Sequence, residues 1–469
     1  MQSTLTNATF WPIFDELRGA LPAPYTHAVP TIGALALLHA GAQYREVFAS
    51  LGVTFDEDLG HTLQDLQFTP RAFSDALKRV ANVNKTLSDL PQLSETSRLP
   101  EHLLPRLNLG VGKVIARAAL LAPDLAGLLS VGVAYTELLE QLARDGKYGG
   151  GESSTPASLA ELLIDLLEVQ PGMRVLDPTL GNAHIFVALA RRLRGEGHDA
   201  NSVEYVGQEI NLSATLTAKV HLLLNGVSRF TVHHGNVLTE PKTALGAFDR
   251  VLADPPFGMI AQHVATRVEQ DPRFVLSGNR MPRSAEWLFM QHGLTALKPG
   301  GRAAFVTAHG PLFRAGTEEQ IRSAFSSSGW LSAVIALPSA LYANTGLPVA
   351  VTIFERPAPD GRKQQDVVMI DASLRGTKEG RLQTLGAATR KELATLVKER
   401  RDQEELSRVV TPAEIHANAE AWQPNQYISK PAEDERSLNS IRADLEAAQM
   451  RLQQAETRLH KAFATLDNH

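Results

Sequence analysis

MRVLDPTLGNAHIFVALARRL, residues 173–193, joins a short apolar run to an amphipathic helical pattern through a turn that contains Gly181. A β-rich run that leads into helical spacing is typical of one strand-helix unit in a sheet covered by helices. Six further apolar runs follow: VEYVGQEI, FTVHHGN, FDRVLADPPF, GRAAFVTAH, LSAVIALP and VAVTIFER. The alternation predicts an α/β fold with a seven-stranded, mostly parallel sheet that carries helices on both faces.

Helical patterns precede the predicted sheet. Residues 1–146 have the apolar spacing of helices, interrupted by proline-rich and polar joints, which predicts a small helical domain. The glycine-rich segment DGKYGGGESS breaks this pattern, and TPASLAELLIDLLEV then resumes a helix that we expect Thr155 to cap. We therefore place the sheet domain at residues 147–357.

The end of the chain carries two further patterns. Residues 358–430 form a polar extension with a helical stretch near 393–406, and QPNQYISKPAEDE has the composition of a linker. In residues 431–469 the apolar side chains alternate spacings of three and four, which predicts a coiled-coil helix that docks a partner. The seam of this helix consists of Leu438, Ile441, Leu445, Ala448, Leu452, Ala455, Leu459, Ala462 and Leu466.

The composition excludes several classes of function. The 469 residues include no cysteine, so disulfides, cysteine-ligated zinc and thiolate nucleophiles are excluded. The net charge is -5, so the chain lacks the basic balance of an autonomous nucleic-acid binder, and any DNA contact needs a local patch or a partner. No pattern of metal ligands is present, and His233-His234 is expected to end a strand. Without an apolar run long enough for a membrane span, or a secretion signal, we expect a cytoplasmic protein.

Polar residues follow the first three predicted strands. The first strand ends at Asp177, and Gly181 then lets the backbone pass close to a ligand. The second strand ends at Glu209, whose carboxylate can accept hydrogen bonds from both hydroxyls of a ribose. Asn236 follows the third strand, and its amide can contact the edge of an adenine base. Ligands of such sheets bind beyond the carboxyl ends of the strands, although each residue alone is equally consistent with a turn or surface position.

The fourth predicted strand ends in Asp254-Pro255-Pro256-Phe257. Two successive prolines stiffen the chain and lack N–H donors, so hydrogen-bond acceptors are concentrated beside Asp254. An exocyclic amine flipped out of a duplex could donate its two protons to Asp254 and to the Pro255 carbonyl, with Phe257 stacked on the base. The nitrogen lone pair would then face a methyl donor, which predicts a base amino-methyltransferase.

The absence of cysteine decides between two kinds of base methylation. Transfer to cytosine C5 requires a covalent thiolate adduct, so that route is excluded. Attack by an exocyclic nitrogen needs only alignment and stabilisation of the developing charge, which Asp254 can supply. Adenine N6 and cytosine N4 present similar geometry, and a related loop could act on RNA or on a protein glutamine. A non-enzymatic scaffold that binds DNA or a partner is a further alternative.

Several motifs, in this order, resemble the modification subunits of type I restriction-modification systems, a family of adenine-specific DNA methyltransferases. They include TPASLAELLIDLLEVQPGMRVLDPTLGNAHIF, GQEINLSATLTAKVHLLLNG, FDRVLADPPFG, AEWLFMQHGLTALKPGGRAAFVTAHGPLF and VIALPSALYANTGLPVAVTIF. The resemblance implies a Rossmann-like, S-adenosylmethionine-dependent methyltransferase domain and transfer to adenine N6. It also implies a cofactor site formed by Thr155, Asp177, Gly181, Glu209 and Asn236, and a target-base site formed by Asp254, Pro255, Pro256 and Phe257.

The same resemblance implies the partners. A DNA-specificity subunit would recognise the sequence of double-stranded DNA, and we expect a hetero-oligomer that contains two copies of this chain and a restriction subunit. The chain departs from the family at residues 182–184, Asn-Ala-His, where small glycine and serine residues are usual, so we expect a narrower cofactor loop. It also carries Asn236 where aspartate is common and Asp254 where type I enzymes commonly have asparagine.

Overall fold

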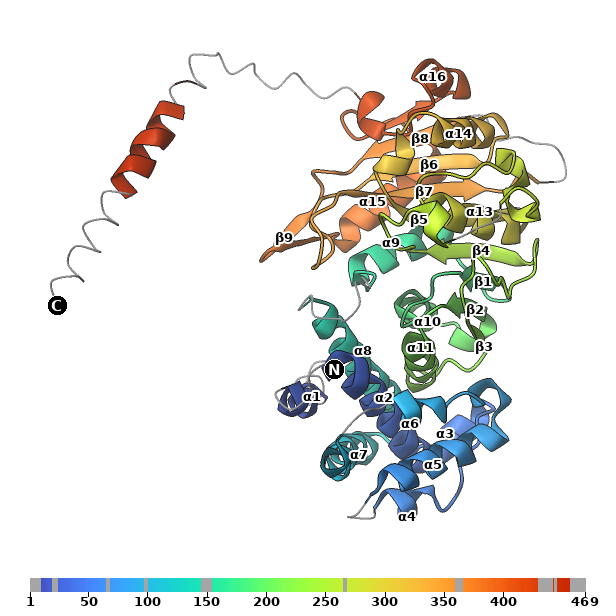
Figure 1. Ribbon diagram of the computed structural model, residues 1–469, viewed down its shortest axis with the longest axis vertical. Helices are drawn as coiled ribbons and strands as arrows, with labels where there is room; N and C mark the ends of the chain where they lie inside the picture. The colour runs from blue at the N-terminus through green and yellow to red at the C-terminus, as the bar shows by residue number, and fades with distance from the viewer. Residues whose placement is uncertain are drawn as a thin grey trace.

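The computed structural model describes residues 10–18, 24–64, 68–96, 100–144, 154–264, 268–358, 366–428, 442 and 445–455. Its centre is a mixed, mostly parallel sheet of nine strands in the order β11-β8-β6-β7-β5-β4-β1-β2-β3 (Figure 1). The strands are β1 (Arg174–Asp177), β2 (Glu204–Glu209), β3 (Phe230–His234), β4 (Phe248–Ala253), β5 (Leu297–Ala308), β6 (Leu331–Ala336), β7 (Val349–Glu355), β8 (Val367–Asp371) and β11 (Ser407–Val410). β7 runs antiparallel to β5 and β6, and β11 runs antiparallel to β8, whereas the other neighbours are parallel.

The seven strands expected from the apolar runs are all present as β1 to β7, and β3 ends at His234 as expected. The expected total of seven is wrong, because the C-terminal extension adds β8 and β11 to the same sheet. All five residues of β8 are buried, and β8 pairs in parallel with β6. This strand depends on pairing with a distant partner, and its short apolar run within a polar segment gives little local signal. β9 (Thr377–Glu379) and β10 (Leu382–Thr384) form a separate hairpin.

Helices cover both faces of the sheet. Alternate strand residues point to opposite faces, so Val175 and Leu176 of β1 belong to different apolar clusters. The first cluster includes Phe186 and is covered by α9 (Ala157–Leu167), α10 (His184–Gly195), α11 (Leu212–Leu224) and α15 (Ala387–Glu399). The second includes Trp287 and Trp422, with ring centroids 5.5 Å apart, and is covered by α13 (Glu286–Ala296), α14 (Thr317–Ser327) and α16 (Pro412–Ala417).

The N-terminal helices lie beyond β3, beside α10 and α11 (Figure 1). They are α1 (Trp11–Arg18), α2 (Pro24–Gln43), α3 (Arg45–Ser50), α4 (Leu59–Leu63), α5 (Pro70–Val83), α6 (Gln92–Thr96), α7 (Leu104–Leu121) and α8 (Leu125–Arg144). A Cβ atom at Gly132 of α8 would lie 2.4 Å from the carbonyl oxygen of Leu224, so only glycine permits this close approach to the end of α11. The helical region therefore shares one continuous core with the sheet.

One local expectation in the C-terminal extension is confirmed with shifted bounds, and another is wrong. The helix expected near 393–406 is present as α15, which begins after Gly386 and ends at Glu399, because Arg400 takes a left-handed conformation with φ of 49°. The expected linker begins with residues that pack into the core: Tyr427 is buried, and its hydroxyl donates a hydrogen bond to the carbonyl of Ala421 at 2.5 Å. The segment is polar in composition, but its aromatic side chain joins the second cluster.

The predicted coiled-coil seam is only partly described. Residues 445–455 are helical, and in Figure 1 this red segment lies apart from the sheet. The side chains of Leu445 and Leu452 are 59% and 61% exposed, so this helix does not bury its seam against the rest of the chain. Seam residues outside the described residues are Leu438, Ile441, Leu459, Ala462 and Leu466. Among the described helices, none combines the length and apolar character needed to cross a membrane.

Candidate active site

The carboxyl ends of four parallel strands meet at one edge of the sheet. β1 ends at Asp177 and β2 ends at Glu209, while Asn236 and Asp254 follow β3 and β4. The N–H of Gly235 donates to the carbonyl of Glu209 at 2.9 Å, which ties the turn after β3 to the end of β2. The charges of Glu209 and Asp254 both act on Asp177. The structure thus brings together the polar residues that the sequence places after separate strands.

The loop after β4 presents two hydrogen-bond acceptors without donors. The Oδ2 atom of Asp254 is buried and has no partner among the described residues. Pro255 is buried, and within the described part of the chain nothing donates to its carbonyl. Pro256 is exposed at the tip of the loop and contributes no N–H group. A buried acceptor without a donor is costly, which makes this pair a candidate site for a ligand amine.

Three side chains support this loop. The hydroxyl of Tyr342 donates to Oδ1 of Asp254 at 2.8 Å, and the hydroxyl of Thr155 also donates to this carboxylate. The ring of Phe257 is partly exposed and meets Tyr342 edge-on, with centroids 5.4 Å apart and an interplanar angle of 85°. Thr155 does not cap α9, because Pro156 occupies the cap position, and its hydroxyl binds the stronger, charged acceptor instead.

Burial changes the titration of two site carboxylates. Burial raises the pKa of Asp254 to about 6, while the hydroxyls of Thr155 and Tyr342 oppose this rise. Burial also raises the pKa of Asp177 to about 8, and the nearby charges of Asp254 and Glu209 add to the effect. A positively charged ligand at this sheet edge would favour the ionised form of both carboxylates.

The loop after β1 leaves room for that ligand. Gly181 adopts a left-handed conformation with φ of 53°, and a Cβ atom there would meet nothing within 4 Å. Its N–H donates to Oε2 of Glu209 at 2.8 Å, and the other oxygen of Glu209 accepts the N–H of Asn211 at 2.7 Å. Ala183 is also left-handed, with φ of 63°. The space above Gly181 itself is open, and the narrower loop expected from residues 182–184 stays a prediction.

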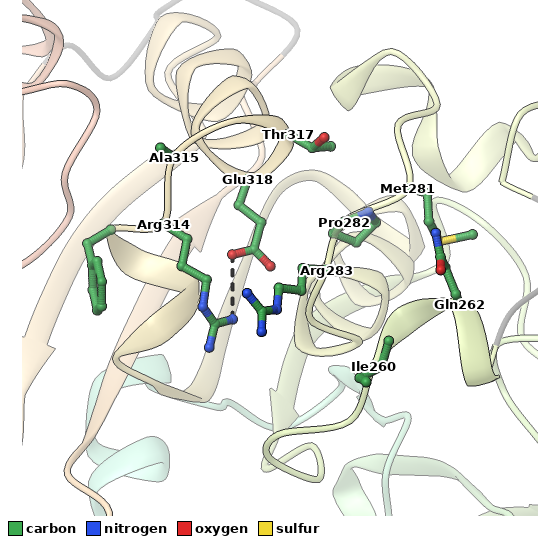
Figure 2. A pocket seen from close by; sticks show the side chains of 10 residues that line it. Ile260, Gln262, Met281, Pro282, Arg283, Arg314, Ala315, Thr317 and Glu318 are labelled. Carbon is green, nitrogen blue, oxygen red and sulfur yellow. Dashed lines mark ion pairs between the residues drawn. The ribbon is translucent and has the colours of Figure 1, made fainter.

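A cavity of about 650 Å³ lies next to the loop after β4, residues 254–257, which is called the acceptor loop below (Figure 2). It lies among residues 260–262, 281–283 and 313–318. The first segment follows the acceptor loop directly, and the last follows β5. The sheet order β5-β4-β1-β2-β3 therefore places the acceptor loop between this cavity and the Asp177 side of the edge.

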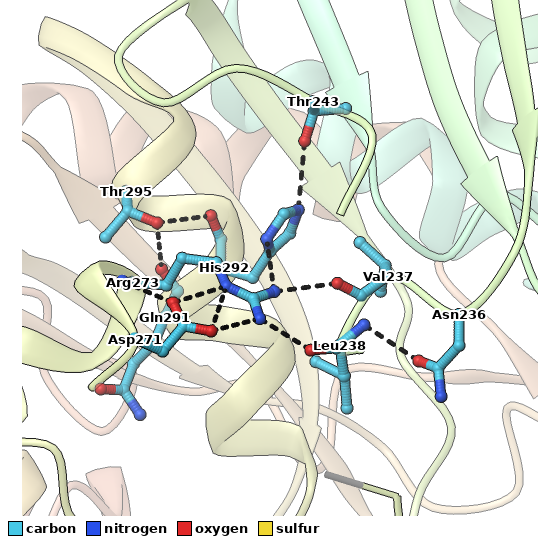
Figure 3. Close-up of polar contacts among 9 residues, drawn as sticks. All are labelled: Asn236, Val237, Leu238, Thr243, Asp271, Arg273, Gln291, His292 and Thr295. Carbon is cyan, nitrogen blue, oxygen red and sulfur yellow. Dashed lines mark hydrogen bonds and ion pairs between the residues drawn. The ribbon is translucent and has the colours of Figure 1, made fainter. Parts of the chain in front are cut away.

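A buried polar network fixes the turn after β3 (Figure 3). Oδ1 of Asn236 accepts the N–H of Leu238 at 2.9 Å, so its Nδ2 group is the part of the amide that can contact a ligand. Arg273 is only 4% exposed and donates to the carbonyls of Val237 and Leu238 at 2.9 and 2.7 Å. Burial and the Arg273 charge lower the pKa of His292 to about 3, so neutral His292 can accept a hydrogen bond from Arg273.

A second network links the helical region to the loop after β1. His221 of α11 lies 2.7 Å from the carbonyl of Asn182 through Nδ1 and 2.8 Å from the hydroxyl of Thr136 on α8 through Nε2. Burial lowers the pKa of His221 well below its usual value, so the ring is neutral. Because a carbonyl can only accept, Nδ1 donates to Asn182 and Nε2 accepts from Thr136. Helix α8 thereby holds the backbone beside Gly181.

Sequence reasoning missed three supporting residues. Tyr342 lies in the matched segment VIALPSALYANTGLPVAVTIF, but nothing in the pattern shows that its hydroxyl contacts Asp254. Arg273 lies 36 residues from Val237, whose carbonyl it binds, and His221 lies 39 residues from Asn182, whose carbonyl it binds. A polar residue within an apolar helical pattern can indicate a buried hydrogen bond, and of these three residues only His221 has this pattern.

The sheet and the helices that cover it form the α/β fold of S-adenosylmethionine-dependent methyltransferases. The chain belongs to the N-6 DNA methylase family, whose sequence profile matches residues 129–436. The curated relatives that it matches are named as methylase subunits of type I restriction enzymes.

Two relatives come from Methanocaldococcus jannaschii. The type I restriction enzyme MjaVII methylase subunit is 28% identical over 415 residues, which cover 84% of this chain and 69% of that protein. The MjaIX methylase subunit is 28% identical over 307 residues, which cover 62% of this chain and 54% of that protein. The chain thus spans about half to two thirds of the length of these relatives.

A solved structure has the same fold. The crystal structure of a type I restriction-modification system methyltransferase subunit from Streptococcus thermophilus matches with a TM-score of 0.74 at 23% identity. The match covers 91% of this chain and 100% of that chain. The α/β arrangement and its helical flank are therefore shared with that protein.

Proposed function

We propose that the chain uses Asp254 and Pro255 to present the amine of a flipped adenine to a sulfonium methyl donor. The observation that carries this proposal is a pair of acceptors without donors in the described residues: the buried Oδ2 of Asp254, and the carbonyl of Pro255, a buried residue. An exocyclic amine has two N–H donors, one for each acceptor. The partly exposed ring of Phe257, held edge-on by Tyr342, keeps a face available for stacking on the base.

The chemistry that these residues perform is alignment and charge stabilisation. With both N–H groups directed to the loop, the amine nitrogen turns its lone pair towards the cofactor side of the site. S-adenosylmethionine supplies an electrophilic methyl group there. As the nitrogen–carbon bond formed, the sulfur–methyl bond would break and the cofactor would leave as a neutral thioether. The nitrogen would carry the positive charge, which the carboxylate of Asp254 would stabilise. The nitrogen would then lose one proton to solvent and become neutral again.

The residues expected at the cofactor site are suited to a positively charged nucleoside. Burial together with neighbouring carboxylates raises the pKa of Asp177, and a sulfonium or ammonium group would relieve this repulsion. The open space above Gly181 admits a ligand against the backbone. We propose that Glu209 binds the ribose hydroxyls and that Nδ2 of Asn236 contacts the adenine ring. Thr155, whose hydroxyl reaches Asp254, would separate the cofactor from the base.

Glu209→Ala is expected to weaken cofactor binding tenfold or more. A hydrogen bond to a charged group contributes about 1.5 to 3 kcal/mol, and the ribose contact is lost together with the bond that fixes the Gly181 N–H. Isothermal titration calorimetry measures the affinity. The matched control is Glu204→Ala at the opposite end of β2, where the side chain pairs with Arg174. Equal affinity in Glu209→Ala and wild type would remove Glu209 from the site.

Tyr342→Phe is expected to move the acid limb of kcat/KM to higher pH. The pKa of Asp254 is about 6 with the hydroxyl bond in place, and this bond favours the charged carboxylate. Full activity needs the carboxylate, so the rate should fall as the pH drops through about 6, and loss of the hydroxyl raises the pKa of Asp254 further. Tyr427→Phe, which also removes a buried hydroxyl donor, is the control. The pH profile of kcat/KM reports the free enzyme. Identical acid limbs in Tyr342→Phe and wild type would show that the ionisation of Asp254 does not control catalysis.

The methylated nucleoside identifies which base is the substrate. We expect nucleoside digestion of methylated DNA to yield N6-methyladenine, because the family methylates that amine. N4-methylcytosine would preserve the role of Asp254 and change the substrate. Protein that binds S-adenosylmethionine but modifies no nucleic acid would favour the scaffold alternative.

We also propose that the chain is the modification subunit of a type I system, with residues 147–357 as its catalytic domain. A DNA-specificity subunit would supply sequence recognition, and the assembly would hold two copies of this chain and a restriction subunit. The exposed seam side chains Leu445 and Leu452 support a partner helix outside the main body of the chain. Residues 431–469 would form the coiled coil that docks the specificity subunit.

A further inference from the structure

The cavity beside the acceptor loop carries an excess of positive charge. Figure 2 shows the guanidinium groups of Arg283 and Arg314 directed towards the same space, close to Glu318. Glu318 is 2% exposed, accepts the N–H of Ser284 at 2.7 Å and pairs with Arg314 at 3.6 Å. Arg283 is exposed and forms no ion pair with any carboxylate in the described segments. Among the residues that line the cavity, one carboxylate thus faces two cations, which leaves room for an anionic ligand. The charge of Arg314 also acts on Glu286, which is buried beneath the lining, so Arg283 is the cation more available to a ligand.

The same cavity has an apolar rim. Phe313 is 49% exposed and Ile260 is 47% exposed, and both line the cavity. An exposed aromatic ring beside unpaired arginine charge is the combination that binds a nucleotide, because the ring stacks on a base or sugar while guanidinium groups bind the phosphate.

The position of the cavity decides which nucleotide it can hold. The cofactor residues follow β1, β2 and β3, whereas the cavity is lined by segments that follow β4 and β5. Ile260 is three residues beyond Phe257, so the cavity begins where the target-base loop ends. The buried acceptors of Asp254 and Pro255 lie in that loop, not among the residues that line the cavity. A strand whose base is flipped towards Asp254 would continue directly across the cavity.

We propose that this cavity binds the DNA strand next to the flipped base, with Arg283 and Arg314 on a phosphodiester and Phe313 on the adjoining sugar or base. The assignment rests on the proposed function. It names a DNA contact within this chain that is separate from sequence recognition. The phosphate contacts carry no sequence information, so they add affinity to every site that a partner selects.

Arg283→Ala tests the phosphate contact, because the exposed side chain makes no ion pair that the fold depends on. The full chain, assembled with its partner subunits, is titrated with fluorescent target duplex at several salt concentrations. We expect weaker DNA binding and a log Kd against log salt slope reduced by about one. The affinity for S-adenosylmethionine should not change. Arg283→Glu should weaken binding more than Arg283→Ala.

Two variants make the result specific. Arg229→Ala removes the same charge from an exposed position before β3, at the opposite edge of the sheet, and should leave the DNA affinity close to that of wild type. Phe313→Ala should weaken DNA binding about tenfold without changing the salt slope, because stacking releases no counterions.

The outcomes separate this proposal from the proposed function. Wild-type protein that methylates DNA, together with an Arg283→Ala variant of unchanged affinity and slope, would overturn the cavity assignment alone. A slope that falls equally in Arg229→Ala would overturn it as well, since the effect would be one of overall charge. Inorganic phosphate that binds the cavity without competing with DNA would make it a free-anion site instead. Failure of wild type to methylate any base would count against the proposed function.

Discussion

Asp254→Ala is expected to lower the rate of methyl transfer more than tenfold, equivalent to more than about 1.4 kcal/mol of transition-state stabilisation. The variant removes the buried Oδ2 acceptor and the charge that would stabilise the methylated nitrogen. Cofactor affinity should change little, because the carboxylate is proposed to act on the target base. Single-turnover methylation measures the chemical step, and calorimetry measures cofactor affinity.

Asp254→Asn is the matched variant. An asparagine keeps the size of the side chain and an acceptor oxygen, and the resemblance places asparagine at this position in many type I enzymes. We expect measurable activity in Asp254→Asn and no acid limb near pH 6, because the group that titrates at about 6 is gone. Phe257→Ala should lose activity through weaker base stacking. An Asp254→Ala enzyme with more than about a tenth of wild-type activity would contradict the role of the carboxylate.

Deletion of residues 436–469 is expected to abolish co-purification with the specificity subunit and, with it, sequence-specific methylation. The described part of this segment exposes its leucine side chains, and an isolated helix of this length is only marginally stable in water. It therefore needs a partner to bury the seam. Cofactor binding should be unaffected, because the residues proposed to bind the cofactor follow β1, β2 and β3. Affinity co-purification and methylation mapping measure the two effects.

A charge-matched pair of variants tests the seam without truncation. Leu445→Glu with Leu452→Glu places two charges on the seam, and Gln449→Glu with Gln454→Glu places two charges beside it. Only the first pair should release the specificity subunit. If the truncated protein still assembles and methylates the same sites, the seam is not the docking element.

Most of the sheet could be predicted from the sequence because the signal is local. In the run RVLD and its successors, apolar β-forming residues end at a polar residue and lead into a helix, and β1 to β7 formed where expected. β8 and β11 were missed, since each becomes a strand only by pairing with a strand distant in sequence. Tyr427 was missed for the same reason: a polar composition conceals one aromatic side chain that packs against distant elements.

The candidate site also contains features that could be predicted from the sequence and features that could not. Residues at the carboxyl ends of parallel strands meet at one edge by topology alone, so Asp177, Glu209 and Asp254 could be predicted to lie together. Side-chain hydrogen bonds across elements could not be predicted. Thr155 was expected to cap a helix, but its hydroxyl contacts Asp254, and the contribution of Tyr342 depends on a segment 88 residues further along the chain.

The most direct test is single-molecule sequencing of host DNA from cells with and without the gene, and from cells that carry the Asp254→Ala variant. This measurement reports the modified base, its position and the surrounding motif together. The account predicts N6-methyladenine at a defined motif in wild-type cells, and none at that motif in the deletion or in the Asp254→Ala strain. The same methylation in all three strains, or modification of a different atom at the motif, would contradict it.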